Sequence, residues 1–78
     1  MENIDERIKE VMSAVFGVDA DTINEESSQD NIENWESIKT LDLIVALEEE
    51  FGITIPLEEV GNMTNFKYIK LMIKELAA

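Results

Sequence analysis

Apolar side chains recur at the spacing of an α-helix in three separate segments of this 78-residue chain. On this periodicity we expect helices over residues 3–16, 37–51 and 65–76. Gly17 and Gly52 directly follow the first two segments, at the position where a glycine often ends a helix. A β-strand would instead show alternation with a period of two. The pattern therefore predicts an all-α fold.

The segments between these helices differ in length and character. Residues 18–36 are polar and acidic, and a loop of this length in so small a chain usually has a function. Residues 53–56 alternate like a short strand, but a single strand would have no partner, so we expect a connector. Residues 57–61 follow Pro56 and predict one short helical turn. No repeat is apparent, and we expect residues 1–78 to form a single domain.

The second helix has two apolar faces. One face is the candidate core side, and it comprises Leu43, Ile44, Leu47 and Phe51. The other lies roughly 140° away on the helical wheel, and it comprises Ile38, Leu41 and Val45. A helix in a small bundle needs only one buried stripe, so this Ile38-Leu41-Val45 strip requires another explanation. The core side is expected to pack against apolar residues of the other two helices, namely Ile4, Ile8, Val11, Val15, Ile69, Ile73 and Leu76.

Acidic side chains border the Ile38-Leu41-Val45 strip. Asp42 and Glu49 flank one edge, and Glu48 flanks the other. An apolar strip bordered by acids is typical of a docking surface, because burial supplies affinity and the charges supply steering. The alternative is that the long loop folds over the strip through Ile32 or Trp35. The pattern alone leaves both interpretations open.

The charge balance restricts the partners of the chain. Eighteen acidic residues against six basic ones give a formal net charge of −12. Such a charge argues against binding to nucleic acid or to an anionic membrane surface, and it favours basic patches on protein partners. Three basic residues, Lys67, Lys70 and Lys74, share one face of the last helix, and we expect that face to be solvated.

The chain contains no cysteine and no histidine. Disulfides, cysteine catalysis and a zinc site are therefore excluded, and Ser37 has no ordinary base that would make it a catalytic nucleophile. Residues 19–30 begin like a calcium loop, but Ile23 occupies a ligand position, so no metal site is predicted. The N-terminus is acidic and carries no targeting pattern, and no apolar run is long enough for a membrane span. We expect a cytoplasmic protein that is not an enzyme.

Ser37 stands at the start of the second helix, within Glu36-Ser37-Ile38. The free N–H groups and the dipole of a helix N-terminus would stabilise a phosphodiester attached there. This tripeptide resembles the Asp-Ser-Leu attachment motif of acyl and peptidyl carrier proteins. Residues 43–53, Leu-Ile-Val-Ala-Leu-Glu-Glu-Glu-Phe-Gly-Ile, are very similar to that family's second helix and its exit. The resemblance extends over the full length of the chain.

The resemblance implies a four-helix bundle in which the third helix is short and a long loop joins helices one and two. It also implies that a phosphopantetheinyl transferase moves 4′-phosphopantetheine from coenzyme A onto Ser37, whose arm then holds an acyl or aminoacyl group as a thioester. Further partners would be an acyl- or aminoacyl-loading ligase and the synthase or transferase enzymes of fatty-acid, polyketide or nonribosomal-peptide biosynthesis. We expect the carrier to be a monomer.

The same resemblance implies a partner-binding surface, which comprises Glu36, Ile38, Leu41, Asp42, Val45, Glu48 and Glu49. Glu36 replaces the usual Asp, and because Glu is a poorer N-cap, we expect Asn34 to cap the second helix. Lys39 and Trp35 favour a specialised or peptidyl carrier over the housekeeping fatty-acid carrier, and Trp35 is expected to pin the loop to the bundle. The alternative function is an acidic helical interaction module without a prosthetic group, which would bind partners through the Ile38-Leu41-Val45 strip.

Overall fold

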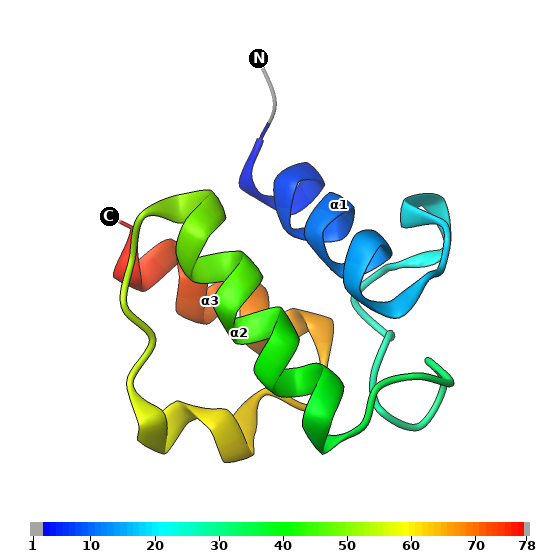
Figure 1. Cartoon of the computed structure of the whole chain (residues 1–78). Coiled ribbons are helices and arrows are strands. Elements are labelled where there is room, and N and C mark those ends of the chain that lie inside the picture. Colours follow the sequence, from blue (N-terminus) through cyan, green and yellow to red (C-terminus); the bar gives the residue numbers. More distant parts are fainter. Residues whose placement is uncertain (1–2, 78) are drawn as a thin grey trace.

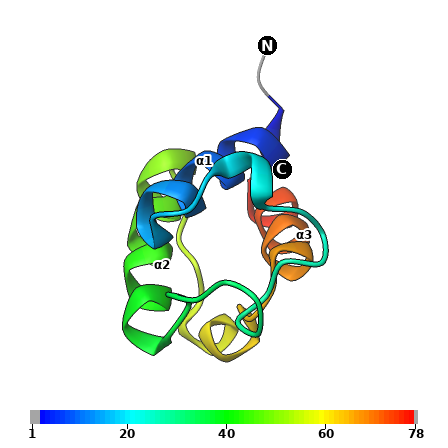
Figure 2. The ribbon, with the colours of Figure 1, turned by 90° about the vertical axis from the view of Figure 1, so that its right-hand side faces the viewer.

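The computed structural model describes residues 3–77, and the side chain of Ser37 lies outside the described part. Within residues 3–77, five helical elements follow one another: α1 (Ile4–Phe16), η1 (Ala20–Thr22), α2 (Ser37–Phe51), η2 (Leu57–Asn62) and α3 (Phe66–Leu76) (Figure 1). The longer elements surround one core, with α1 opposite η2 and α2 opposite α3 (Figure 2). The predicted all-α bundle with a short third helix is therefore confirmed, and the 3₁₀ turn η1 within the long loop is an addition to it.

The ends of the helices lie where the sequence places them. Gly17 and Gly52 end α1 and α2 in the left-handed conformation, with φ of 71° and 64°. A side chain with a Cβ would be strained at both positions, which explains the choice of glycine. At the other end of α1, the Asn3 side chain accepts a hydrogen bond from the Glu6 N–H at 2.8 Å. Asn65 caps α3 in the same way, accepting from the Tyr68 N–H at 2.8 Å.

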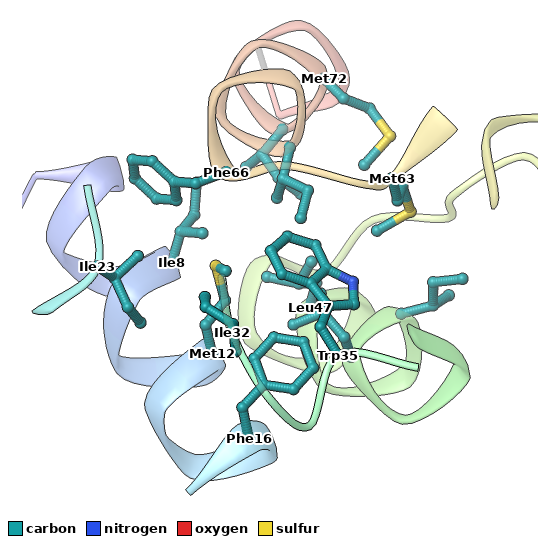
Figure 3. Packing of buried hydrophobic residues seen from close by; sticks show 14 of the residues in the cluster. Ile8, Met12, Phe16, Ile23, Ile32, Trp35, Leu47, Met63, Phe66 and Met72 are labelled. Atoms are coloured by element: carbon teal, nitrogen blue, oxygen red, sulfur yellow. The ribbon is translucent and has the colours of Figure 1, made fainter. Parts of the chain in front are cut away.

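The core contains side chains from the three α-helices, from the long loop and from the segments on either side of η2 (Figure 3). As predicted, α2 buries Leu43, Ile44 and Leu47, while Phe51 is half-buried under the Arg7 guanidinium. The prediction for α1 is only partly right. Its buried residues are Ile8, Met12 and Phe16, whereas Ile4, Val11 and Val15 are only partly buried. The buried side chains of α3 are Phe66, Ile69, Met72 and Ile73.

The long loop between α1 and α2 packs inward. Ile23, Ile32 and Trp35 are all buried in the core. The indole ring of Trp35 stacks on the Phe16 ring with centroids 5.0 Å apart, so the expected pinning of the loop by Trp35 is confirmed. The Ser27 carbonyl accepts a hydrogen bond from the Phe66 N–H at 2.9 Å, which ties the loop to the start of α3. Because these anchors point into the core, the loop does not cover the Ile38-Leu41-Val45 strip.

The lysine face of α3 is not simply solvated, contrary to our expectation. Lys70 pairs with Glu25 of the long loop, and its Nζ lies 3.9 Å from the Asp5 carboxylate of α1. Only 12% of the Lys70 side chain is exposed. Lys74 adds a contact of 3.7 Å to Asp5. This ionic cluster joins α1, the loop and α3, elements that lie far apart in the sequence, which is why helical spacing alone did not reveal it.

The Lys70–Glu25 pair should make stability depend on pH. The hydrogen bond from Lys70 lowers the pKa of Glu25, and the same bond raises the pKa of Lys70. A carboxyl with a lowered folded-state pKa contributes its stability above its ordinary value of 4.5 and loses it as the pH falls through the lowered value. For Lys70 the contribution is complete below the ordinary value of 10.5 and is lost as the pH rises through the raised pKa.

We therefore expect Glu25→Gln to lower the melting temperature slightly, since the Glu25 side chain is exposed and solvent screens its charge. The difference from the wild type should be constant at neutral pH and should disappear as the pH falls below 4.5. Thermal unfolding of both proteins across this range measures it. The matched control is Glu26→Gln, because Glu26 has no ion pair among the described residues. A difference that persists in acid would contradict the assignment to this pair.

No helix within residues 3–77 has the length and apolar character that crossing a membrane would require.

Candidate functional site

Ser37 is the first residue of α2, and the segment before it is held firmly. Glu36 has an extended backbone, and its carbonyl accepts from the Thr40 N–H at 2.8 Å and from the Thr40 hydroxyl at 3.1 Å. One residue earlier, Trp35 is buried in the core. The backbone of Ser37 is therefore fixed at the exit of a structured loop. The orientation and exposure of its hydroxyl lie outside the described part of the chain and stay a prediction.

Asn34 does not cap α2, and the expectation that it would is wrong. Its side-chain amide donates to the Phe16 carbonyl at 2.9 Å, so it satisfies a carbonyl at the C-terminal end of α1 instead. The N-cap position of α2 is Glu36, whose side chain makes no capping hydrogen bond. Folding of the loop against α1 brings Asn34 to the Phe16 carbonyl, and this long-range contact prevails over the local capping preference.

The N-terminus of α2 suits an attached anion. The first N–H groups of a helix have no partner within the helix, and here no N-cap side chain accepts from them, in contrast to Asn3 of α1 and Asn65 of α3. The first turn of α2 also contains no acidic residue, whereas that of α1 contains Asp5 and Glu6. Free donors and the positive end of the helix dipole would both stabilise a phosphodiester at Ser37.

A groove opens between α2 and η2, close to Ser37 along the helix. Its volume is about 390 Å³, and it is lined by Gln29, Thr40, Leu41, Val60, Gly61 and Thr64. Thr40 and Leu41 lie one helical turn after Ser37 and therefore on the same side of α2. Figure 2 shows η2 beside the N-terminal end of α2. A flexible chain attached at position 37 would thus have this groove within one helical turn of its attachment point.

The Ile38-Leu41-Val45 strip faces solvent. The exposed fractions of its side chains are 75%, 54% and 56%. Leu57, at the start of η2, is another large apolar side chain that is exposed. The sequence predicts only a helical turn at Leu57, because a single leucine in a short element shows no periodicity. Exposed apolar side chains on adjoining elements are a common feature of protein interaction sites.

The acidic residues around the strip differ in their exposure and in their hydrogen bonds. Glu36, Asp42 and Glu49 are exposed. Glu48 is half-buried, and its carboxylate accepts a hydrogen bond from the Ile55 N–H at 2.8 Å. That bond holds the connector between α2 and η2 in place. Glu48 therefore has a structural contact of its own, which the sequence could not reveal because the connector's path depends on the fold.

A comparison with protein families agrees with this geometry. A family model described as "Phosphopantetheine attachment site" matches residues 6–66. The match runs from the first turn of α1 to Phe66, the first residue of α3, and it includes the long loop, α2 and η2.

Proposed function

This chain belongs to the phosphopantetheine attachment site family, whose domain binds 4′-phosphopantetheine covalently, and we propose that Ser37 is the residue that receives this group. The proposal is supported chiefly by the start of α2, where a serine in the family-like motif coincides with uncapped backbone N–H groups. The position matters because the phosphodiester would form on the serine oxygen, directly beside these donors.

The prosthetic group and the protein would supply different functions, because the chain itself contains no cysteine thiol. When bound, phosphopantetheine supplies a terminal thiol on a flexible arm, which the chain, having no cysteine, does not possess. The first-turn N–H groups of α2 would hold the phosphate, and the groove along Thr40 and Leu41 would receive the arm. Domains of this family are generally not catalytic, and we propose that this chain carries a thioester-linked substrate without converting it.

We further propose that the cargo is an acyl or aminoacyl group of a specialised biosynthetic pathway. The partners would be a phosphopantetheinyl transferase, a loading ligase, and synthase or transferase enzymes, which would dock on the exposed Ile38-Leu41-Val45 strip. Glu36, Asp42 and Glu49 would steer these partners, with Glu48 in a lesser role because it already accepts from Ile55. A monomeric carrier in the cytoplasm remains our expectation.

Loading with coenzyme A tests this function. The purified protein is incubated with coenzyme A, magnesium and a broad-specificity phosphopantetheinyl transferase. We expect a mass gain of one phosphopantetheine group, located by peptide mapping on the segment that contains Ser37. If a known carrier is loaded in the same mixture and this protein is not, the proposal is wrong. The exposed strip would then favour the second candidate, an acidic interaction module without a prosthetic group.

Charge reversal on α2 tests the partner surface. We expect Asp42→Lys with Glu49→Lys to slow association with a basic transferase by about tenfold at low salt, because electrostatic steering would be lost. Stopped-flow association rates at several salt concentrations measure this. Both residues are exposed, so the melting temperature should hardly change. The matched control is Glu10→Lys with Asp30→Lys, which changes the net charge equally at exposed positions off α2. Equal slowing by both pairs would show that only net charge matters.

A further inference from the structure

Trp35 buries a hydrogen-bond donor that has no partner in the described part of the chain. Only 3% of the residue is exposed, and its Nε1–H finds no acceptor among the described residues. Burial of an unpaired donor costs free energy, and nearly all buried polar groups in folded proteins are satisfied. Stacking on Phe16 needs the aromatic ring but not the N–H group. Pinning of the loop therefore does not explain why this position carries an indole.

Three flexible methionine side chains share the core with the indole ring. Met12, Met63 and Met72 are all buried in the core. Methionine is unbranched and flexible, so it adapts its shape more easily than Leu or Ile. Figure 3 shows the indole nitrogen on the Met63 side of the ring, with Met72 beyond Met63. Two flexible core side chains therefore lie on the side of the ring that carries the unpaired N–H.

A route connects Ser37 to this part of the core. The groove between α2 and η2 is lined by Gly61 and Thr64, and Met63 lies between these two residues in the chain. The Met63 side chain is fully buried and belongs to the core, so it lies next to the backbone segment that forms this wall of the groove. Thr40 and Leu41 on the opposite wall lie one turn after Ser37. A chain that enters the groove and displaces Met63 would meet the Trp35 N–H.

We propose that the indole N–H of Trp35 is a hydrogen-bond donor for an oxygen-bearing acyl group drawn into the core, such as a 3-oxoacyl chain. This inference rests on the proposed function. Both kinds of cargo have the carbonyl that links them to the arm, but only the 3-oxo group adds an oxygen farther along the chain that could satisfy the donor inside the core. Trp35 would then be a specificity-determining residue that favours oxygenated cargo over saturated cargo.

Nuclear magnetic resonance tests the proposal directly, because the chain has one tryptophan and hence one indole N–H signal. The protein is loaded with phosphopantetheine analogues that carry a hexanoyl or a 3-oxohexanoyl group through a stable amide link. We expect a downfield shift of the indole proton with the 3-oxohexanoyl group and little change with the hexanoyl group. The 3-oxohexanoyl form should also melt at a higher temperature than the hexanoyl form.

Trp35→Phe is the matched variant, since it keeps an aromatic ring and removes the N–H group. We expect it to abolish the difference in melting temperature between the two loaded forms. The same indole shift with both cargos, or with neither, would overturn the proposal, and this comparison needs only the wild-type protein. Mass spectrometry reports loading separately, so a failure to load would refute the proposed function and not the assignment of Trp35.

Discussion

Ser37→Ala is expected to abolish the addition of phosphopantetheine completely, so that no mass gain appears after incubation with coenzyme A and a transferase. The reason is chemical: the phosphodiester needs the serine oxygen, and alanine has none. The fold should be retained, because alanine is the best helix former and position 37 is the first residue of α2. Intact-mass measurement gives the result, and thermal unfolding confirms the fold.

Ser28→Ala is the matched control for this experiment. Ser28 lies in the long loop, and its hydroxyl oxygen accepts a hydrogen bond from the Asp30 N–H at 3.1 Å. Loss of this local bond should leave loading intact. If the Ser37→Ala protein still gained the group, or if Ser28→Ala also prevented loading in a folded protein, Ser37 would not be the attachment residue.

Leu43→Ala is expected to destabilise the protein by about 2–5 kcal/mol, the usual cost of a leucine deletion in a packed core. Leu43 is fully buried between α2 and the rest of the bundle. The core of so small a domain supplies only about 3–5 kcal/mol of net stability, so much of the variant should be unfolded. Urea unfolding followed by circular dichroism measures the loss.

Leu41→Ala is the matched control, because it makes the same chemical change two residues away on the same helix. Leu41 is half-exposed in the Ile38-Leu41-Val45 strip, so its removal should cost at most about 1 kcal/mol. If the strip is the docking surface, Leu41→Ala should instead weaken binding to partner enzymes. Similar stability losses for the two variants would contradict the assignment of two distinct faces to α2.

Most of the helices could be predicted because their signals are local. The end of α1 at Gly17 and the whole span of α2 follow from glycine and from apolar spacing, which need no knowledge of the rest of the fold. The prediction of which α1 side chains are buried was less accurate. The expected core residues of α1 did not include Phe16, although it follows Ile8 and Met12 at intervals of four residues, and its ring also stacks on Trp35 of the loop. That contact forms only when the loop folds back.

The features of the candidate site also fall into two groups, those that depend on the local sequence and those that depend on the tertiary structure. Ser37, its motif and the two faces of α2 could be read from the residues, because a helix places side chains on its faces by a fixed rotation. Two other features of the site could not be predicted from the residues. Asn34 bonds to the Phe16 carbonyl instead of capping α2, and Glu48 bonds to the Ile55 N–H. Both contacts depend on where distant backbone groups come to lie.

The sequence by itself determined the helical class, the helix ends and the position of Ser37, since these depend on the conformational preferences of neighbouring residues. Only the tertiary structure decided that the loop packs inward and leaves the Ile38-Leu41-Val45 strip exposed. It also decided that a groove lies beside α2 and that the Trp35 N–H is buried without a partner among the residues that the structure describes. These features arise where segments far apart in the sequence compete for one small core, and their packing cannot be read from any one segment.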